Sequence, residues 1–172
     1  HSQDTAELFF TNCRIPEKNI LGSQGGGFLM LMDKLQQERL VCAVGAICGA
    51  EFIFDYTLEY YRNHQAQLGK SQAVQFALAE MATQVKMGRT FVNDLVERHT
   101  AGEHVVIETC MAKYWTSDAA KEIGDRCMDL LGDFSAQDSC LVSKAYKDIR
   151  VMPIFAGTNE IMKGIIAKSI GI

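Results

Sequence analysis

Apolar residues recur at alternating steps of four and three between positions 72 and 100. Positions at this spacing fall on one side of an α-helix, because the helix has about 3.6 residues per turn. The stripe consists of Val74, Leu78, Met81, Val85, Gly88, Val92 and Leu95. The sequence therefore predicts a helix over 72–100 that packs against a neighbouring helix along this stripe.

Four further segments are predicted to be helical, at about 28–62, 104–131, 140–150 and 159–170. Pro153 separates the last two, because proline has no backbone N–H to donate and restricts the residue before it. Long helices joined by short links predict an all-α fold, in which an up-down four-helix bundle is followed by terminal helices.

The beginning of the chain has a different pattern. Residues 4–15, DTAELFFTNCRI, form the only strand-like stretch, and a Pro-Glu-Lys-Asn turn and the run GSQGGG follow it. We therefore expect a short extended N-terminal segment before the first helix.

The most apolar run, Leu40 to Phe54, is predicted to be a buried core helix. A membrane span needs about 20 apolar residues, whereas this run is shorter and contains Glu51. The net charge of −4, with both signs mixed along the chain, indicates no basic patch for nucleic acid. We expect neither an integral membrane segment nor nucleic-acid binding.

The six cysteines are scattered along the chain, with no Cys-x-x-Cys pair and no Cys/His cluster at zinc spacing. They are Cys13, Cys42, Cys48, Cys110, Cys127 and Cys140. We interpret them as buried free thiols in a reducing compartment, and we expect no metal site.

Three stretches resemble a known family: DTAELFFTNCRIPEKNILG, LQQERLVCA and KAYKDIRVMPIFAGTNEIMKGIIAK. Together they resemble the acyl-CoA dehydrogenase family, and QERL, CMAKYW and PIFAGTNEIM are most similar to its long-chain branch. The resemblance implies that residues 1–24 are the end of a middle β-domain with its linker, and that residues 25–172 are the C-terminal helical bundle domain. It implies α,β-dehydrogenation of acyl-CoA thioesters in fatty-acid β-oxidation, with FAD as the hydride acceptor.

Much of this family places its catalytic Glu in the closing loop, where this chain has Ala156. Branched-chain and long-chain members place it on the first long helix instead, and Glu38 matches that position. The resemblance thus implies that Glu38 is the base that removes the α-proton, and that Arg39 binds near the thioester end of the substrate. Without the resemblance, Glu38 reads as a solvated carboxylate in a surface pair and Arg39 as half of a structural salt bridge.

The resemblance also implies four contacts to FAD. Gly157, Thr158 and Glu160 lie at the start of the last helix, and the alternative for Thr158 is a helix cap only. Gln65 stands where the family usually has an Arg for the pyrophosphate. Loss of that charge would weaken the contact by roughly 1 kcal/mol or more.

A second departure lies in the run LLGDFSAQDS, where family members usually have Gly-Gly-x-Gly-Tyr preceded by a Gln. Asp129 stands near the Gln position, Asp133 and Ser135 replace glycines, and only Gly132 remains. An acidic residue beside a pyrophosphate repels it unless the loop follows another path. The lost glycines therefore predict a rearranged loop.

Two functions remain open at this point. The first is an FAD-dependent dehydrogenase that, by resemblance, passes electrons to electron-transferring flavoprotein and forms a homodimer or homotetramer in the mitochondrial matrix. The second is a catalytically degenerate scaffold or assembly protein with weak or no flavin binding. Glu38, Arg39 and Thr158 favour the first, whereas Gln65 and Asp129 favour the second. In either case we expect this chain alone to be inactive, since the β-domain would hold most of the flavin ring.

Overall fold

A computed structural model describes residues 6–65 and 71–172. Within them the chain forms α1 (Gly27–Asn63), α3 (Gln72–Thr100), α4 (Val106–Leu131), α5 (Leu141–Ile149) and α6 (Asn159–Ser169), with short 3₁₀ helices η1 (Glu17–Asn19) and η2 (Gly132–Ala136). The five predicted helices are confirmed, and their ends differ from the prediction by two residues at most.

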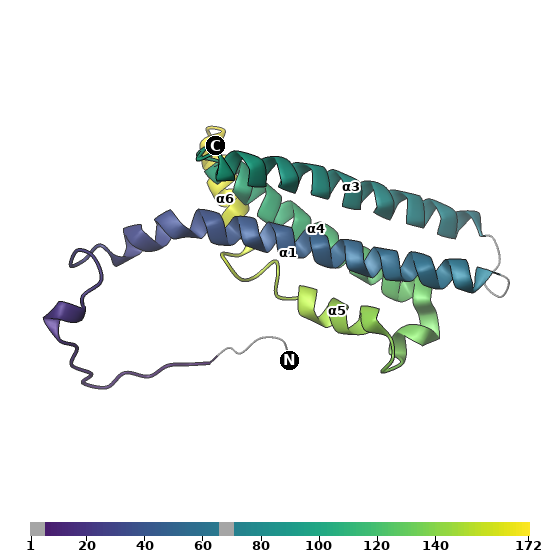
Figure 1. Cartoon of the computed structure of the whole chain (residues 1–172), viewed down its shortest axis with the longest axis horizontal. Coiled ribbons are helices and arrows are strands. Elements are labelled where there is room, and N and C mark those ends of the chain that lie inside the picture. The colour runs from purple at the N-terminus through teal and green to yellow at the C-terminus, as the bar shows by residue number, and fades with distance from the viewer. Residues whose placement is uncertain (1–5, 66–70) are drawn as a thin grey trace.

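Helices α1, α3, α4 and α5 lie alongside one another and alternate in direction, as the colour gradient in Figure 1 shows. Helix α4 contacts the other four helices, and α6 packs on α4. The predicted all-α, up-down bundle with a terminal helix is therefore confirmed.

Small residues bring the three long helices close together. Gly88 of α3 is buried, and a Cβ added there would lie 2.4 Å from Cδ1 of Ile47 and 3.1 Å from Cζ3 of Trp115. Along the predicted stripe of α3 the buried residues are Met81, Val85, Gly88, Val92 and Leu95. Val74 and Leu78 are half-buried, so the stripe is deepest towards the middle and end of α3.

Helix α1 is the main core helix. By length and composition alone it could cross a membrane, but half of its most apolar 18-residue window is buried inside the bundle. The core helices of water-soluble bundles pass the same test, and Ala46, Ile47, Ala50 and Ile53 of α1 have no exposed surface. This burial fits the core helix that the sequence predicts at this position.

The strand-like stretch does not form a strand in residues 6–15, the part of it that the structure describes. A strand is stable only when a neighbouring strand takes up its hydrogen bonds, and this segment instead runs extended and exposed. Leu8, Phe9 and Phe10 are 76%, 84% and 77% exposed. The predicted extended N-terminal segment is thus present in residues 6–15, without strand pairing there.

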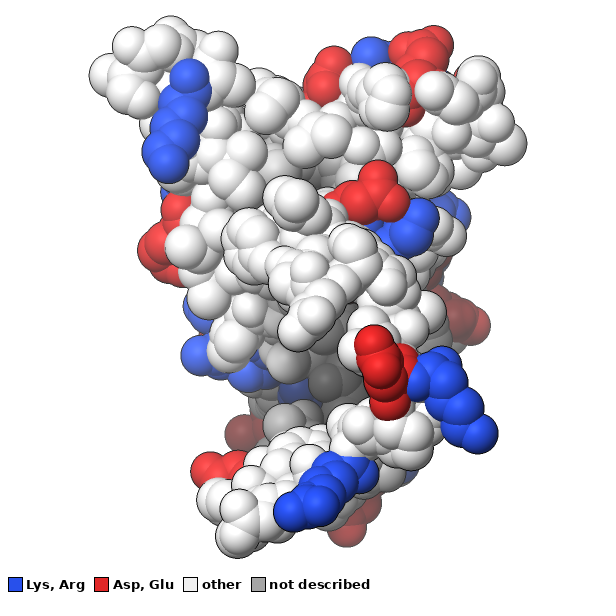
Figure 2. Space-filling view, turned by 90° about the vertical axis from the view of Figure 1, so that its left-hand side faces the viewer, with Lys and Arg blue, Asp and Glu red and all other residues white. Residues whose placement is uncertain are grey.

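The end of the molecule at which α1 begins has few charges in its middle, where uncharged atoms dominate the surface (Figure 2). Phe28, Leu29 and Leu31 of α1 are all more than half exposed. Together with the apolar residues of the N-terminal segment, they leave an apolar surface at this end. Contiguous apolar surface of this kind is typical of contact regions.

The cysteines only partly follow the prediction. All six are free thiols, and Cys42, Cys110, Cys127 and Cys140 are buried. Cys13 is exposed because it lies in the extended N-terminal segment, and Cys48 is half-buried, where its Sγ accepts a hydrogen bond from Nη1 of Arg89 at 3.1 Å. The interpretation of every cysteine as buried is therefore wrong for these two. The described residues contain no cluster of metal-binding side chains.

Candidate active site

A cleft of about 670 Å³ lies between α1 and the loop 150–158 that joins α5 to α6. We call it the α1 cleft. Its helix wall consists of Lys34, Gln37, Glu38, Val41, Cys42 and Gly45, and its loop wall of Met152, Phe155 and Ala156. The helix residues are spaced by one, three and four, so they form a single stripe on α1.

The loop runs antiparallel to α1 along this cleft. Ala156 lies level with Arg39, because its carbonyl oxygen accepts a hydrogen bond from Arg39 Nε at 3.2 Å. Met152 lies level with Gly45, where an added Cβ would be 3.6 Å from Met152 Cε. The cleft therefore has a Glu38 end and a Gly45 end.

Glu38 is exposed and lines the cleft together with Ala156. Among the described residues it has no ion pair and no side-chain hydrogen bond, so the surface pair that would mark it as an ordinary helix carboxylate is not formed there. A free carboxylate that faces a cleft is accessible to a bound molecule, as a general base must be. Its role as the base stays a prediction.

Arg39 points the other way, into the bundle. Its side chain is 7% exposed and does not line the α1 cleft. Besides the bond from Nε to Ala156, its Nη1 donates to Sγ of Cys110 at 3.8 Å. Arg39 has no salt bridge within the described part of the chain, so that alternative is wrong there. Arg39 therefore holds the loop through a hydrogen bond from the bundle side. Its contact with substrate stays a prediction.

A second buried cation holds the next residue of the loop. Lys113 of α4 is completely buried, and its Nζ donates to the carbonyl oxygen of Gly157 at 2.7 Å and to Oδ1 of Asn159 at 2.9 Å. Burial lowers the pKa of Lys113 below its usual range. Two successive loop carbonyls, those of Ala156 and Gly157, are thus held by cations from two helices.

These bonds stabilise an unusual backbone. Ala156 and Gly157 have φ values of 55° and 98°, in the left-handed region that side chains disfavour by about 1 kcal/mol or more at Ala156. In a trans peptide the C=O and N–H groups point in opposite directions. The held carbonyls therefore direct the N–H groups of Gly157 and Thr158 away from the bundle interior. In the described chain the N–H groups of Ala156, Gly157 and Thr158 have no hydrogen-bond partner.

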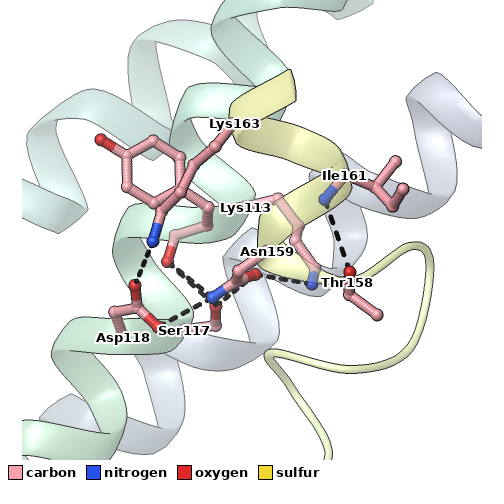
Figure 3. A network of polar contacts seen from close by, with 8 residues as sticks. Lys113, Ser117, Asp118, Thr158, Asn159, Ile161 and Lys163 are labelled. Atoms are coloured by element: carbon pink, nitrogen blue, oxygen red, sulfur yellow. Dashed lines mark hydrogen bonds and ion pairs between the residues drawn. The ribbon is translucent and has the colours of Figure 1, made fainter. Parts of the chain in front are cut away.

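Asn159 joins α6 to α4. Its Nδ2 donates to Oδ1 of Asp118 and to Oγ of Ser117, both at 2.8 Å, while Oδ1 accepts from Lys113. Figure 3 shows this side chain reaching from the start of α6 into the polar groups of α4. Because α6 follows the loop directly, the network fixes where the loop ends.

The sequence analysis identified neither Lys113 nor Asn159 as a site residue. A signal for Lys113 exists, since it is the only charged residue in CMAKYW on a long core helix. A lysine in such a run either reaches solvent with its tip or finds buried acceptors. Asn159 was missed because the residue before it, Thr158, gives the more common sequence signal, that of a helix cap.

Thr158 is the N-cap of α6, and its Oγ1 accepts a hydrogen bond from the N–H of Ile161 at 3.4 Å. The N–H of Glu160 and the Thr158 hydroxyl lower the pKa of the Glu160 carboxyl below its usual range. The cap predicted as the alternative for Thr158 is therefore formed. Contacts of Gly157, Thr158 and Glu160 with FAD stay predictions.

Gln65 lies at the opposite end of the bundle. It lines a hollow of about 220 Å³ between the end of α1 and the start of α3, together with Leu58, Tyr61, Arg62, Ser71, Val74, Gln75 and Leu78. At a rise of about 1.5 Å per residue, the end of α1 is about 36 Å from Arg39. The four residues assigned to FAD thus form two separate groups, one at each end of the bundle.

The donor groups of this hollow suit a phosphate. Arg62 has no ion-pair partner in the described residues, and it stands one helical turn before Gln65. Ser71 is the N-cap of α3, a 29-residue helix whose N-terminus favours anions. A guanidinium, two amides and two hydroxyls are groups that can bind a phosphate, and Arg62 carries the positive charge that Gln65 lacks. Sequence reasoning missed Arg62, although its position one turn before Gln65 is visible in the sequence.

The altered glycine run forms η2 at this same end. Phe134 of η2 stacks on Tyr60 of α1, with ring centres 4.6 Å apart and an interplanar angle of 11°. Gly132 has a positive φ of 51°, and Asp129 and Asp133 are exposed. The segment is a short 3₁₀ turn anchored by Phe134. That it differs from the family's loop stays a prediction.

The family profile described as acyl-CoA dehydrogenase, C-terminal domain, matches residues 25–171. The chain belongs to the acyl-CoA dehydrogenase family. Its sequence is 41% identical over 173 aligned residues to the mitochondrial long-chain specific acyl-CoA dehydrogenase of Rattus norvegicus, covering 98% of this chain and 40% of that protein. It is 32% identical to an acyl-CoA dehydrogenase of Bacillus subtilis, covering 98% of this chain and 45% of that protein.

The fold agrees with this assignment. The structure superimposes on a crystal structure of acyl-CoA dehydrogenase from Geobacillus kaustophilus with a TM-score of 0.91 and 44% sequence identity, covering 95% of this chain and 44% of that one. This acyl-CoA dehydrogenase domain thus spans less than half the length of the relatives that it matches.

Proposed function

We propose that the chain is the C-terminal domain of an FAD-dependent acyl-CoA dehydrogenase that introduces a trans double bond between the α- and β-carbons of an acyl-CoA thioester. Long chains are the proposed substrates, because the rat relative is named for them. The observation that carries the proposal is the position of Glu38, an unpaired carboxylate that lines one cleft together with Ala156.

In this proposal Glu38 removes the α-proton. A carboxylate at this place can act only when the α-carbon lies within reach, and the loop wall of the cleft fixes where the substrate sits. Arg39 and Lys113 act on the loop rather than on the substrate, since both donate hydrogen bonds to loop carbonyls from the bundle side.

The backbone of the loop completes the polar part of the site. Negative charge grows on the thioester oxygen as the α-proton leaves. The unpartnered N–H group of Gly157 is a donor suited to this oxygen, because donors that are fixed in advance stabilise developing charge best. Arg39 holds this N–H group in place by binding the carbonyl of the same peptide, that of Ala156.

FAD, when bound, accepts the hydride from the β-carbon, a reaction that no side chain can perform. Gly157, Thr158 and Glu160 at one end of the bundle and Arg62 with Gln65 at the other are the residues that would hold it. Because the two groups lie at opposite ends of the bundle, each cofactor would contact two copies of the chain.

The remaining parts of the proposal follow from family membership. Residues 1–24 would be the end of a middle β-domain, and the apolar surface at the start of α1 would contact that domain. The electron acceptor would be electron-transferring flavoprotein. The enzyme would be a homodimer or homotetramer in the mitochondrial matrix, as the mitochondrial relatives suggest.

A degenerate scaffold without flavin is the second candidate, favoured by the exposed acidic residues Asp129 and Asp133 at the same end of the bundle as Gln65. An absorbance spectrum of the full-length protein, before and after anaerobic addition of a long-chain acyl-CoA, separates the two. Flavin absorbance that bleaches on addition supports the dehydrogenase. A protein that takes up no flavin from excess FAD overturns the dehydrogenase and leaves the scaffold.

A further inference from the structure

The α1 cleft changes character along its length. At one end Lys34, Gln37 and Glu38 are polar, and at the other Val41, Cys42, Gly45 and Met152 are apolar or small. An acyl thioester has the same polarity, with a polar head and an alkyl tail. The chemistry of the walls therefore orients the tail from Glu38 towards Gly45.

At the Gly45 end, the flexible side chain of Met152 forms the loop wall of the cleft. Gly45 is the last α1 residue in the cleft wall, about 10 Å along the helix from Glu38. Opposite it lies Met152, whose Cε would be 3.6 Å from a Cβ added at Gly45, an ordinary van der Waals contact. Gly45 thus keeps open a space that even a small side chain would begin to fill.

We propose that Gly45 and Met152 set the length of acyl chain that the cleft accepts, an inference that rests on the proposed function. Glycine at position 45 lets an alkyl tail pass along α1, and Met152 forms the opposite wall at that level. A larger residue at position 45 shortens the apolar end, whereas a smaller residue at position 152 opens it.

The test uses the full-length enzyme with FAD and a series of saturated acyl-CoA thioesters of increasing length. The measured quantity is the ratio of kcat/KM for long chains to kcat/KM for short chains. Gly45→Leu should lower this ratio about tenfold or more, because a misfit of even one methylene in an apolar pocket changes kcat/KM by about 10- to 200-fold. Gly45→Ala, which fits without clash, should lower it less. Met152→Ala should raise it, and added to Gly45→Leu it should recover part of the loss.

Gly49→Ala is the matched control. Gly49 lies one turn further along α1 and outside the cleft wall, and an added Cβ would lie 3.1 Å from Cγ2 of Ile149. This change disturbs helix packing and should leave the ratio unaltered.

The outcomes separate the two hypotheses. If the unmodified enzyme is active and both Gly45 variants keep its ratio of long-chain to short-chain kcat/KM, this inference alone is overturned. If no acyl-CoA of any length reduces the flavin of the unmodified enzyme, both the proposed function and this inference are overturned.

Discussion

Arg39 Nε donates a hydrogen bond to the carbonyl oxygen of Ala156 at 3.2 Å, so the residue next to Glu38 fixes the loop residue that faces Glu38 across the cleft. These two neighbours on α1 thus have different positions: Glu38 lines the cleft, and Arg39 binds the loop. Glu38 points into the cleft and Arg39 into the bundle, because adjacent residues on a helix lie about 100° apart. A shift of α1 would move both residues together and preserve their relation to the loop.

Replacement of Glu38 by Gln should lower the rate of flavin reduction by an acyl-CoA by about 10² to 10⁴, because the amide has the same size but cannot take a proton. The measurement is anaerobic stopped-flow absorbance on the full-length enzyme. Glu59→Gln changes an exposed carboxylate of α1 outside the cleft and should leave the rate unchanged. A Glu38→Gln enzyme that reduces its flavin at the unmodified rate would exclude Glu38 as the base.

Replacement of Lys113 by Met should lower the free energy of unfolding by about 1–3 kcal/mol near neutral pH, since the carbonyl of Gly157 loses its donor and Oδ1 of Asn159 keeps only the Ser117 hydroxyl. Urea unfolding of the two proteins measures this difference. Lys163→Met, a change of an exposed lysine on α6, is the control and should have little effect.

The same pair of proteins should also differ in their pH dependence. The pKa of Lys113 is lowered in the folded state, so between that value and 10.5 the unfolded chain binds more protons than the folded chain. Stability from this group therefore rises with pH across that window. A neutral amine still has two N–H donors for its two acceptors. The gap between the unmodified protein and Lys113→Met should widen as the pH approaches 10.5, and a constant gap would contradict the buried position of Lys113.

Two glycine substitutions should have opposite effects on stability. At Gly88 an added Cβ would lie 2.4 Å from Ile47, so Gly88→Ala should destabilise the bundle by about 1–3 kcal/mol. At Gly164 of α6 the added Cβ would have no atom within 4 Å apart from its own helix backbone and chain neighbours, so Gly164→Ala should stabilise by about 0.5–1 kcal/mol through helix propensity alone. Thermal unfolding of both variants checks the pair, and equal shifts would refute the close packing of α3 on α1.

Thr158 can be tested for its two roles separately. Thr158→Ala should lower the free energy of unfolding by about 1 kcal/mol through loss of the α6 cap, whereas Thr158→Ser keeps the capping oxygen and most of the stability. If Thr158 also contacts FAD, the affinity of the full-length enzyme for FAD should fall with Ala and stay near normal with Ser. Unchanged FAD affinity in both variants would leave Thr158 as a cap only.

Most of the fold could be predicted from the sequence, because the bundle depends on periodic patterns that are local. The stripe from Met81 to Leu95 and the break at Pro153 are sufficient to define α3 and the separation of α5 from α6. The extended N-terminal segment was predictable as well, because its side-chain pattern is strand-like. A strand also needs a neighbour for its hydrogen bonds, and residue patterns do not reveal whether one is present.

The candidate site was predictable only in part. Glu38 came from a resemblance to known motifs, and the free carboxylate in a cleft agrees with that position. The hydrogen bonds from Arg39 and Lys113 to the loop could not be predicted, because their acceptors are backbone carbonyls that lie 117 and 44 positions away in the sequence. A carbonyl is present at every position, so its use as an acceptor leaves no trace in the sequence.

The separation of Gln65 from Thr158 has a genetic consequence. If one FAD must touch both ends of the bundle, every cofactor is shared between two copies of the chain. Two inactive alleles, one altered at Arg62 and Gln65 and the other at Thr158, would then complement each other when expressed together. In each mixed pair one shared site carries both lesions and the other carries none, so activity returns although no single polypeptide is intact.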